Sequence, residues 1–270
     1  MHILVMKIVV LDLDETLGYF TQFGIFCDCL NNYLAINNSP KINQMQFSNI
    51  LDLYPEFLRP YIINILNYLK GKKLNKYCHK MMIYTNNTGP KEWARTLITY
   101  FEEKINYKII DQIISAFKVN GKRVEICRTT HDKTHKDFIK CTKIPVNAEI
   151  CFLDDSYYPE MANDNIYYIN LKPYFHDIEF KDMLERFKKN NNTFEIINHI
   201  EGIDFDAFMM NEFKKYNYDC VIKDEKEYEI DAILGKQIMI HLQEFFNMSN
   251  KRKTKTIKTK IYKRNKTKRK

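Results

Sequence analysis

The sequence predicts an α/β fold in which a mostly parallel sheet is flanked by helices. Two observations carry this prediction: short apolar runs rich in β-branched residues recur along the first 175 residues, and helical patterns separate them. Four of these runs are predicted to be strands: 8–11, 81–84, 150–153 and 166–169. Their continuous apolar character is typical of strands that are covered on both faces.

Helices and one hairpin are predicted between and after these strands. A helix begins after Gly89 and Pro90, and its apolar residues fall on one face. The pair Asn120-Gly121 predicts a tight turn between two short strands, which form either a small β insertion or merely a surface hairpin. A C-terminal extension contains an amphipathic helix, which is expected to pack on the parent domain or, as the alternative, to bind a partner. Its apolar positions are Ile230, Ile233, Leu234, Ile238, Leu242, Phe245 and Phe246.

The charge of the chain is concentrated at its C-terminus. Residues 251–270 contain 12 Lys or Arg and no acid, so the total of +8 leaves the other 250 residues at −4. The predicted organisation is therefore a domain over 1–189, a helical extension over 190–250 and a disordered basic tail over 251–270. The tail is expected to contact nucleic acid non-specifically or to bind an acidic partner, and a merely solubilising role is the alternative.

Cysteine usage and hydropathy predict an intracellular, soluble protein that is cytoplasmic or nuclear. The seven Cys include no Cys-x-x-Cys pair, which indicates reduced thiols and no disulfide framework. No segment approaches the roughly 18 apolar residues that a membrane span needs, so no membrane partner is expected. The apolar residues 1–11 include Lys7 and run into Asp12, which argues against a signal peptide.

Polar residues follow three of the predicted strands at the points where these strands end. The first strand is followed by Asp12 and Asp14, the second by Thr85, and the third by Asp154 and Asp155. Because the carboxyl ends of parallel strands meet at one edge of a sheet, these side chains are expected to share one crevice. Clustered carboxylates repel one another and need a cation, and oxygen ligands in a partly open site suit Mg²⁺.

The residues at these strand ends resemble the motifs of a known family. Residues 10–17 (VLDLDETL) resemble the first motif of the haloacid dehalogenase-like superfamily, in the wording of its RNA polymerase II C-terminal-domain and NLI-interacting-factor-like phosphatases. Residues 83–85 are similar to the second motif and residues 152–156 to the fourth, in the right order and spacing. The resemblance covers residues 7–189 and implies a Rossmann-like core.

The resemblance also implies a role for each residue at the strand ends. Asp12 would be the nucleophile that forms an aspartyl-phosphate. Asp14 would protonate the leaving oxygen and then accept a proton from the hydrolytic water. Mg²⁺ would bind the side chain of Asp12, the backbone carbonyl of Asp14, and either Asp154 or Asp155, since this sequence has Asp-Asp where the named phosphatases usually have Asp-Asn. Thr85 would hydrogen-bond a phosphoryl oxygen.

Two further polar residues and a lysine complete the predicted site. Thr16 and Asn86 are expected to bind substrate beside Thr85. The third motif of the family is a lysine that neutralises charge on the nucleophile and the phosphoryl group, and both Lys133 and Lys136 are candidates.

Helix capping favours Lys133 over Lys136. Thr134 and Asp137 have the spacing of a capping box with Asp in place of Glu, which predicts a helix that begins at Thr134. The family lysine usually precedes this helix. Lys133 is therefore the preferred residue, and Lys136 is the alternative.

Together these features predict a Mg²⁺-dependent phosphatase that hydrolyses phosphomonoesters through an aspartyl-phosphate intermediate. Analogy with the family alone suggests phosphoserine or phosphothreonine protein as the substrate. The alternatives are a phosphatase of nucleic-acid ends or small phosphate esters, and a catalytically silent binding module of the same fold. The silent module is disfavoured because the complete set of acids, the threonine and a lysine are present.

Overall fold

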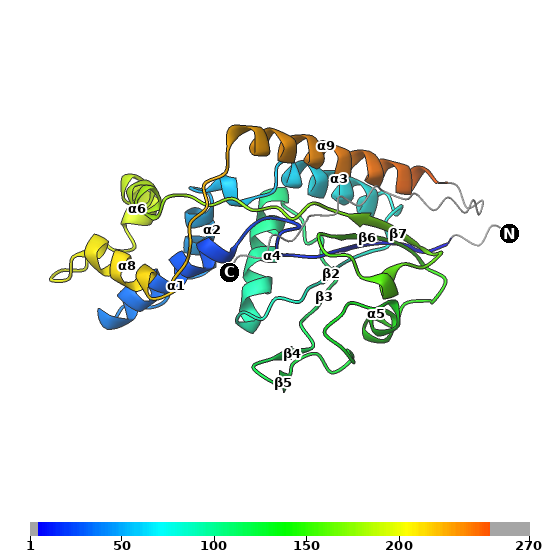
Figure 1. The fold of residues 1–270 in the computed structure, drawn as a ribbon, viewed down its shortest axis with the longest axis horizontal. Coiled ribbons are helices and arrows are strands. Elements are labelled where there is room, and N and C mark those ends of the chain that lie inside the picture. The colour runs from blue at the N-terminus through cyan, green and yellow to red at the C-terminus, as the bar shows by residue number, and fades with distance from the viewer. Residues whose placement is uncertain (1–4, 249–270) are drawn as a thin grey trace, which may run out of the picture.

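Five parallel strands form the central sheet of this chain, of which the computed structural model describes residues 5–248 (Figure 1). The strand order is β3-β2-β1-β6-β7, and each neighbouring pair is parallel. The strands are β1 (Lys7–Leu11), β2 (Lys80–Tyr84), β3 (Gln112–Ile114), β6 (Glu149–Asp154) and β7 (Ile166–Asn170). The predicted α/β fold and all four predicted strands are confirmed, and β3 is an additional edge strand that the sequence analysis did not predict.

Alternate residues of each strand enter two different hydrophobic cores. Val9 of β1 faces the larger core, whereas Ile8 and Val10 face the smaller one. Because the register pairs Val10 with Met82 of β2 and with Phe152 of β6, the same faces continue across the sheet. The central strands are buried on both sides, which explains why their sequences are apolar without alternation.

Helices cover both faces of the sheet. The larger core is closed by three helices, of which α9 lies along α3 in Figure 1. They are α3 (Ile62–Leu74), α4 (Lys91–Ile105) and α9 (Glu225–Asn247). The smaller core is closed by α5 (His135–Thr142), whose Phe138 is fully buried and stacks on Tyr84.

A group of helices extends the larger core beyond one end of the sheet (Figure 1). Its main contacts pair α1 with α8, α6 with α7, and α2 with α7. The helices are α1 (Thr21–Ile36), α2 (Gln44–Leu51), α6 (Phe180–Lys189), α7 (Asn191–Phe194) and α8 (Phe205–Lys214). Edge-to-face aromatic contacts such as Phe26 with Phe180 hold this part of the core together.

The C-terminal extension contributes to the larger core. Leu242 and Phe245 of α9 are buried there, and the Nζ of Lys7 donates a hydrogen bond of 2.6 Å to the carbonyl oxygen of Phe245. A Cβ at Gly235 would lie 2.4 Å from the carbonyl oxygen of Pro60, so glycine is required where α9 crosses this loop. The predicted amphipathic helix thus packs on the rest of the fold, whereas the predicted basic tail lies outside the described residues.

The small β insertion is present as β4 (Lys118–Val119) and β5 (Lys122–Arg123), which pair antiparallel. Both turn residues have a left-handed backbone, with φ of 49° at Asn120 and 76° at Gly121. Asn and Gly adopt this conformation at the lowest cost, so the predicted tight turn is confirmed.

One expectation about the cysteines is wrong. Cys127 and Cys141 form a disulfide, with Cα atoms 5.0 Å apart, whereas the sequence analysis expected reduced thiols throughout. The two residues are 14 positions apart, and only the fold of the loop before α5 brings them together. The other five cysteines are free, and four of these are buried.

Within residues 5–248, none of the helices combines the length and apolar composition required to cross a membrane.

Candidate active site

The first strand carries two aspartates to the carboxyl edge of the sheet. β1 ends at Leu11, and the N–H of Asp12 donates to the carbonyl oxygen of Leu153 at 2.9 Å, so Asp12 continues the line of the strand. The chain then turns back at Gly18. A Cβ at Gly18 would lie 2.4 Å from the carbonyl oxygen of Phe57, so a side chain there would push the loop away from its support.

Lys133 connects β1 and β6 across the edge of the sheet. Its Nζ donates to Asp12 Oδ1 and to Asp154 Oδ2, both at 2.6 Å. The side chains of Lys133 and Asp154 are each 1% exposed, and that of Asp12 is 10% exposed. An ion pair so far from water persists only when the charges and hydrogen bonds match closely, which the two short contacts provide.

The pKa shifts in this cluster follow from burial and from neighbouring charge. Burial disfavours the charged form of Lys133, but Asp12 and Asp154 outweigh it, so the pKa of Lys133 is raised. Burial raises the pKa of Asp154, the charge of Lys133 opposes this rise, and repulsion from Asp12 adds to it. Burial and repulsion from Asp12 also raise the pKa of Asp155. One lysine therefore does not neutralise the acids around it.

Asp12, Asp154 and Asp155 form a three-carboxylate group. Each contributes an oxygen, and these oxygens lie within 4.8 Å of one another. Both oxygens of Asp154 accept hydrogen bonds, one from Lys133 and the other from the N–H of Ser156 at 2.9 Å. Asp155 is half-buried, whereas Asp12 and Asp154 are buried. Carboxylate oxygens at this spacing fit the ligand preference of Mg²⁺.

Asp14 lies beside this group, and its side chain accepts a hydrogen bond from the loop after β2. The side-chain amide of Asn87, just after β2, donates to Asp14 Oδ2 at 2.7 Å. Burial raises the pKa of Asp14 to about 6, the hydrogen bond from Asn87 opposes this rise, and repulsion from Asp12 adds to it. A carboxyl group with such a pKa exchanges protons near neutral pH, as a general acid–base must.

The predicted substrate-binding residues all lie at this edge. Thr85 is buried, and its Oγ1 accepts the backbone N–H two residues later at 3.0 Å, which leaves its own hydrogen free to donate. The hydroxyl of Thr16 donates to Asp155 Oδ1 at 3.0 Å. The side-chain amide of Asn86 donates to the hydroxyl of Tyr158 at 3.0 Å.

The two candidate lysines have different environments. Lys133 enters the carboxylate cluster, whereas Lys136 is exposed on α5. Thr134 caps α5 as predicted, because its side chain accepts the N–H of Asp137 at 3.0 Å. The other half of the predicted capping box, in which the Asp137 side chain would accept the N–H of Thr134, is wrong. The carboxylate of Asp137 instead accepts the N–H of Thr129 at 2.6 Å and the Thr129 hydroxyl at 3.0 Å. Asp137 therefore fixes the loop before Lys133.

Arg128 is a buried residue of the site that the sequence analysis missed. It is 0% exposed, and its Nη1 donates to the carbonyl oxygens of Thr85 at 3.1 Å and Ser115 at 2.9 Å. Its Nη2 donates to the carbonyl oxygen of His131 at 2.8 Å. Arg128 thus joins the end of β2 to the loop that presents Lys133. No local sequence pattern predicts this role of Arg128, because its partners are backbone carbonyls from separate segments.

Arg59 was missed for the same reason. It is 1% exposed, and its Nε donates to the carbonyl oxygen of Thr16 at 2.6 Å. Its Nη2 donates to the carbonyl oxygens of Glu15 and Lys172. Arg59 therefore fixes the backbone of the loop after Asp14 through these hydrogen bonds. Asn87 was also missed, although the nearby Thr85 and Asn86 were predicted to bind substrate.

Comparison with known proteins identifies one distant relative. No model of a known protein family matches the sequence. An uncharacterized protein of Acanthamoeba polyphaga mimivirus is 27% identical over 216 residues, which are 78% of this chain and 70% of the relative. The similarity extends over most of both chains.

Proposed function

We propose that this chain is a Mg²⁺-dependent phosphomonoesterase that works through an aspartyl-phosphate, with phosphoserine or phosphothreonine protein as substrate. One observation carries the proposal: Lys133 lies 2.6 Å from both Asp12 and Asp154 in a buried cluster that still contains more acid than base. In a cluster with a purely structural role, carboxylates without a cationic partner would only lower the stability of the fold, because they repel one another. The resemblance of residues 10–17 to a phosphatase motif supports the same chemistry.

The residues present fit a divalent metal. Three carboxylates within 4.8 Å offer the oxygen ligands that Mg²⁺ prefers, and their excess negative charge requires a cation. Asp12 and Asp155 are the side chains best placed to hold it. Asp155 is half-buried and accepts only from hydroxyl groups, whereas Asp154 is buried and its two oxygens accept from Lys133 and from the backbone N–H of Ser156. When bound, Mg²⁺ supplies positive charge to the phosphoryl oxygens.

Each step of the reaction has a residue to carry it out. The carboxylate of Asp12 attacks phosphorus, the bond to the leaving oxygen breaks, and Asp14 gives that oxygen its proton. Asp14 then removes a proton from water, whose oxygen attacks phosphorus and releases phosphate and free Asp12. Lys133 neutralises charge on Asp12, and the Thr85 hydroxyl donates to a phosphoryl oxygen.

The first experiment measures hydrolysis by the purified chain with Mg²⁺ and with a chelator. An aryl phosphate, phosphoserine peptides and phosphorylated oligonucleotides should be compared. Activity is expected only with Mg²⁺ and is expected to be highest on the peptides. Preference for oligonucleotides would assign nucleic-acid ends as the substrate. No turnover of any of them by the folded chain would favour a silent binding module.

Variants test the roles of the two aspartates. Asp12→Asn should abolish turnover, because an amide does not attack phosphorus, and Asp14→Asn should slow it by about 10²–10⁴-fold. Asp164→Asn makes the same chemical change at an exposed position before β7 and should have no effect. The nucleophile assignment is wrong if folded Asp12→Asn retains the activity of the unaltered chain.

A further inference from the structure

The long C-terminal helix α9 has two faces that carry apolar residues, and the chain buries only one of them. The buried face consists of Asp231, Gly235, Ile238, Leu242 and Phe245. Ile230, Ile233 and Ile240 are 47%, 56% and 45% exposed. At 3.6 residues per turn, these three isoleucines lie roughly 150° around the helix from the buried face. In Figure 1, α9 runs along the outer edge of the molecule beside α3, so the second face is open to solvent.

The exposed face follows the heptad repeat of a coiled coil. Its positions alternate in steps of four and three residues along the helix, and every one of them is exposed. They are Lys226, Ile230, Ile233, Gln237, Ile240, Glu244 and Asn247. Single exposed apolar residues are normal on a protein surface, but this spacing keeps one narrow stripe of a helix in contact with a second helix. The stripe therefore fits another helix as its partner.

An antiparallel second copy of α9 matches this stripe. When the middle of one helix lies against the middle of the other, Ile230 faces Ile240 of the second copy. The same register brings Lys226 opposite Glu244 of the second copy, at both ends of the contact. A two-fold interface makes each contact twice, because residue i meets residue j and residue j meets residue i. The stripe is thus complementary to itself in both shape of pattern and charge.

Charge selects the antiparallel direction over the parallel one. In a parallel pair in register, Lys226 would face Lys226 and Glu244 would face Glu244, and like charges repel. The residues that follow α9 favour the same direction, since 251–270 contain 12 Lys or Arg. An antiparallel pair separates the two basic segments by the length of the 23-residue helix, roughly 34 Å, which exceeds the screening length of about 8 Å.

Two charged side chains of α9 are held by neighbours in the same chain. Glu244 accepts a hydrogen bond of 2.8 Å from the hydroxyl of Tyr167, and its side chain is still 50% exposed. Lys236 would come near its own copy at the two-fold axis, but its Nζ lies 5.3 Å from the centroid of the Tyr61 ring. This cation–π contact holds the lysine at the flank of the stripe.

We propose that the exposed stripe of α9 binds the same stripe of a second copy of this chain in an antiparallel, two-fold dimer. The isoleucines form its apolar centre, and the Lys226–Glu244 pairs close its two ends. Both surfaces are already present on the folded monomer, so changes in the stripe alter association and not the free energy of unfolding of the dilute chain.

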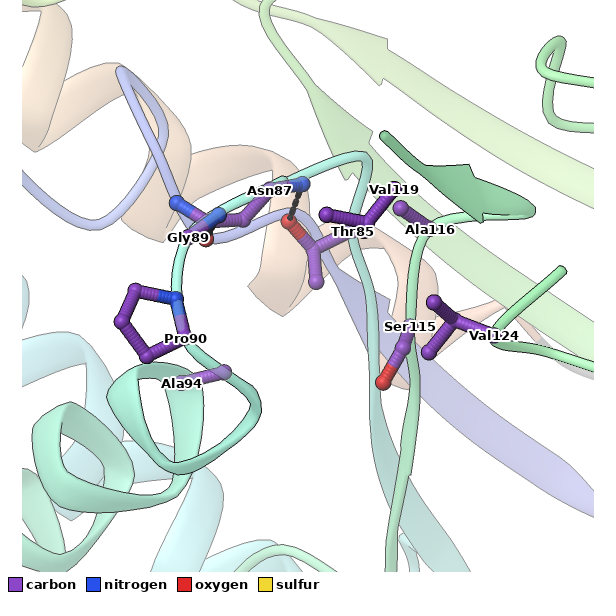
Figure 2. Close-up of a pocket in the computed structure, with 9 residues that line it drawn as sticks. All are labelled: Thr85, Asn87, Gly89, Pro90, Ala94, Ser115, Ala116, Val119 and Val124. Carbon is purple, nitrogen blue, oxygen red and sulfur yellow. Dashed lines mark hydrogen bonds between the residues drawn. The ribbon is translucent and has the colours of Figure 1, made fainter. Parts of the chain in front are cut away.

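This inference is independent of the proposed phosphatase function. A cavity of about 320 Å³ opens beside Thr85 at the candidate active site, and no residue of α9 lines it (Figure 2). Part of its wall is Val119 of the β4–β5 hairpin, which lies on the opposite side of the molecule from α9 in Figure 1. Dimer formation should therefore leave the hydrolysis of a small phosphate ester unchanged.

Sedimentation equilibrium of the full chain measures the association. The chain is first treated with nuclease, because nucleic acid bound to the basic residues after α9 would link two chains. The mass should rise from 32.5 kDa at about 1 µM toward twice this value at about 300 µM, the range expected of a small interface. A chain that stays monomeric over this range, or that assembles beyond a dimer, would overturn the inference.

Charge reversals test the antiparallel register. Lys226→Glu should weaken the dimer about 10-fold, because both end pairs change from attraction to repulsion. Adding Glu244→Lys to this variant exchanges the two charges and should restore the dissociation constant of the unaltered chain. Lys181→Glu reverses an exposed lysine of α6 and should have no effect.

A parallel pair would keep like charges opposite each other in the unaltered chain and in both of these α9 variants. Equal dissociation constants for the unaltered chain and Lys226→Glu would therefore overturn the antiparallel arrangement. A folded double variant without recovery would overturn the pairing of Lys226 with Glu244.

A matched pair of isoleucine variants tests the apolar centre. Ile233→Asp places a carboxylate beside the two-fold axis in both copies and should weaken the dimer by about 100-fold or more. Ile36→Asp makes the same change at an exposed isoleucine at the end of α1 and should leave the dimer intact. Circular dichroism of the dilute chains should show the same fold for both variants. A dimer of unaltered strength in Ile233→Asp would overturn the assignment to α9.

Discussion

The structure buries lysine–aspartate pairs in two regions that differ in their balance of charge. At the carboxyl edge of the sheet, Lys133 pairs with Asp12 and Asp154. Beneath α9, Lys223 bonds Asp231, and both side chains are 1% exposed. The two pairs have similar burial and similar chemistry.

Their surroundings are different. At the carboxyl edge of the sheet, Lys133 pairs with two acids, and Asp14 and Asp155 add two more carboxyls whose pKa is raised. Beneath α9, Lys172 lies 3.7 Å from Asp231 and 4.0 Å from Glu227, so two lysines meet two acids. The balanced cluster needs no ligand and stabilises the fold. The unbalanced cluster gains stability from an added cation, which is the physical reason to assign function to it.

The largest expected effect is on stability, in the balanced cluster. Lys223→Met should lower the free energy of unfolding by about 3–5 kcal/mol, because it removes the main partner of a buried Asp231. Urea unfolding measures the loss. Lys226→Met, an exposed position of α9, serves as control and should change little. Replacing both partners with Lys223→Met and Asp231→Leu should recover most of the loss, and no recovery would contradict the view that the pair is only structural.

The next effect is on rate, in the unbalanced cluster. Lys133→Ala should reduce kcat/KM by about 10²–10³-fold, because a preorganised charge beside the nucleophile is lost. Lys136→Ala should stay near the activity of the unaltered chain, since Lys136 is exposed on α5. Steady-state kinetics on an aryl phosphate decides between them. A large loss at Lys136 with a small loss at Lys133 would reverse the assignment.

The disulfide between Cys127 and Cys141 encloses the segment that carries Lys133, and its removal should lower stability. Cys127→Ser is expected to cost about 3 kcal/mol, the value for a closed loop of about 15 residues. Cys220→Ser alters a free, half-buried cysteine and is the control. Thiol titration of the denatured, unreduced chain should count five thiols, and seven after reduction. Seven thiols before reduction would show that the bond does not form in solution.

The smallest expected effect is the stabilisation by Mg²⁺, which only the unbalanced cluster explains. At 100 times its dissociation constant, Mg²⁺ should add about 2.7 kcal/mol to the free energy of unfolding. The pKa of Asp14 is about 6 in the folded chain and 3.8 for a free carboxyl. Between these two pH values, and without metal, the folded state therefore binds more protons than the unfolded state. The free energy of unfolding falls as the pH rises through this range.

At a fixed Mg²⁺ concentration, the gain should therefore grow from pH 4 to pH 6, because Asp14 loses its proton and adds negative charge beside the metal. Thermal unfolding with and without metal measures it, and Asp155→Asn should reduce it. A gain that is independent of pH, or that survives Asp155→Asn, would mean that the metal binds elsewhere.

The sequence by itself determined four of the five strands of the sheet and the acids that follow them. Apolar β-branched runs specify buried strands locally, and residues that follow a strand must lie at its carboxyl edge, so Asp12, Asp14, Asp154 and Asp155 were predictable. The Asn120-Gly121 turn and the Thr134 cap were predictable as well, because each depends on a few neighbouring residues.

Only the tertiary structure decided what the remaining residues contact. Arg128 and Arg59 bind backbone carbonyls from distant segments, and Cys127 meets Cys141 through the fold of a loop, so no local pattern predicts these contacts. The same holds for the balance of charge around Lys133 and Lys223. Burial of a charge depends on every segment that packs around it, and that information is spread over the whole chain.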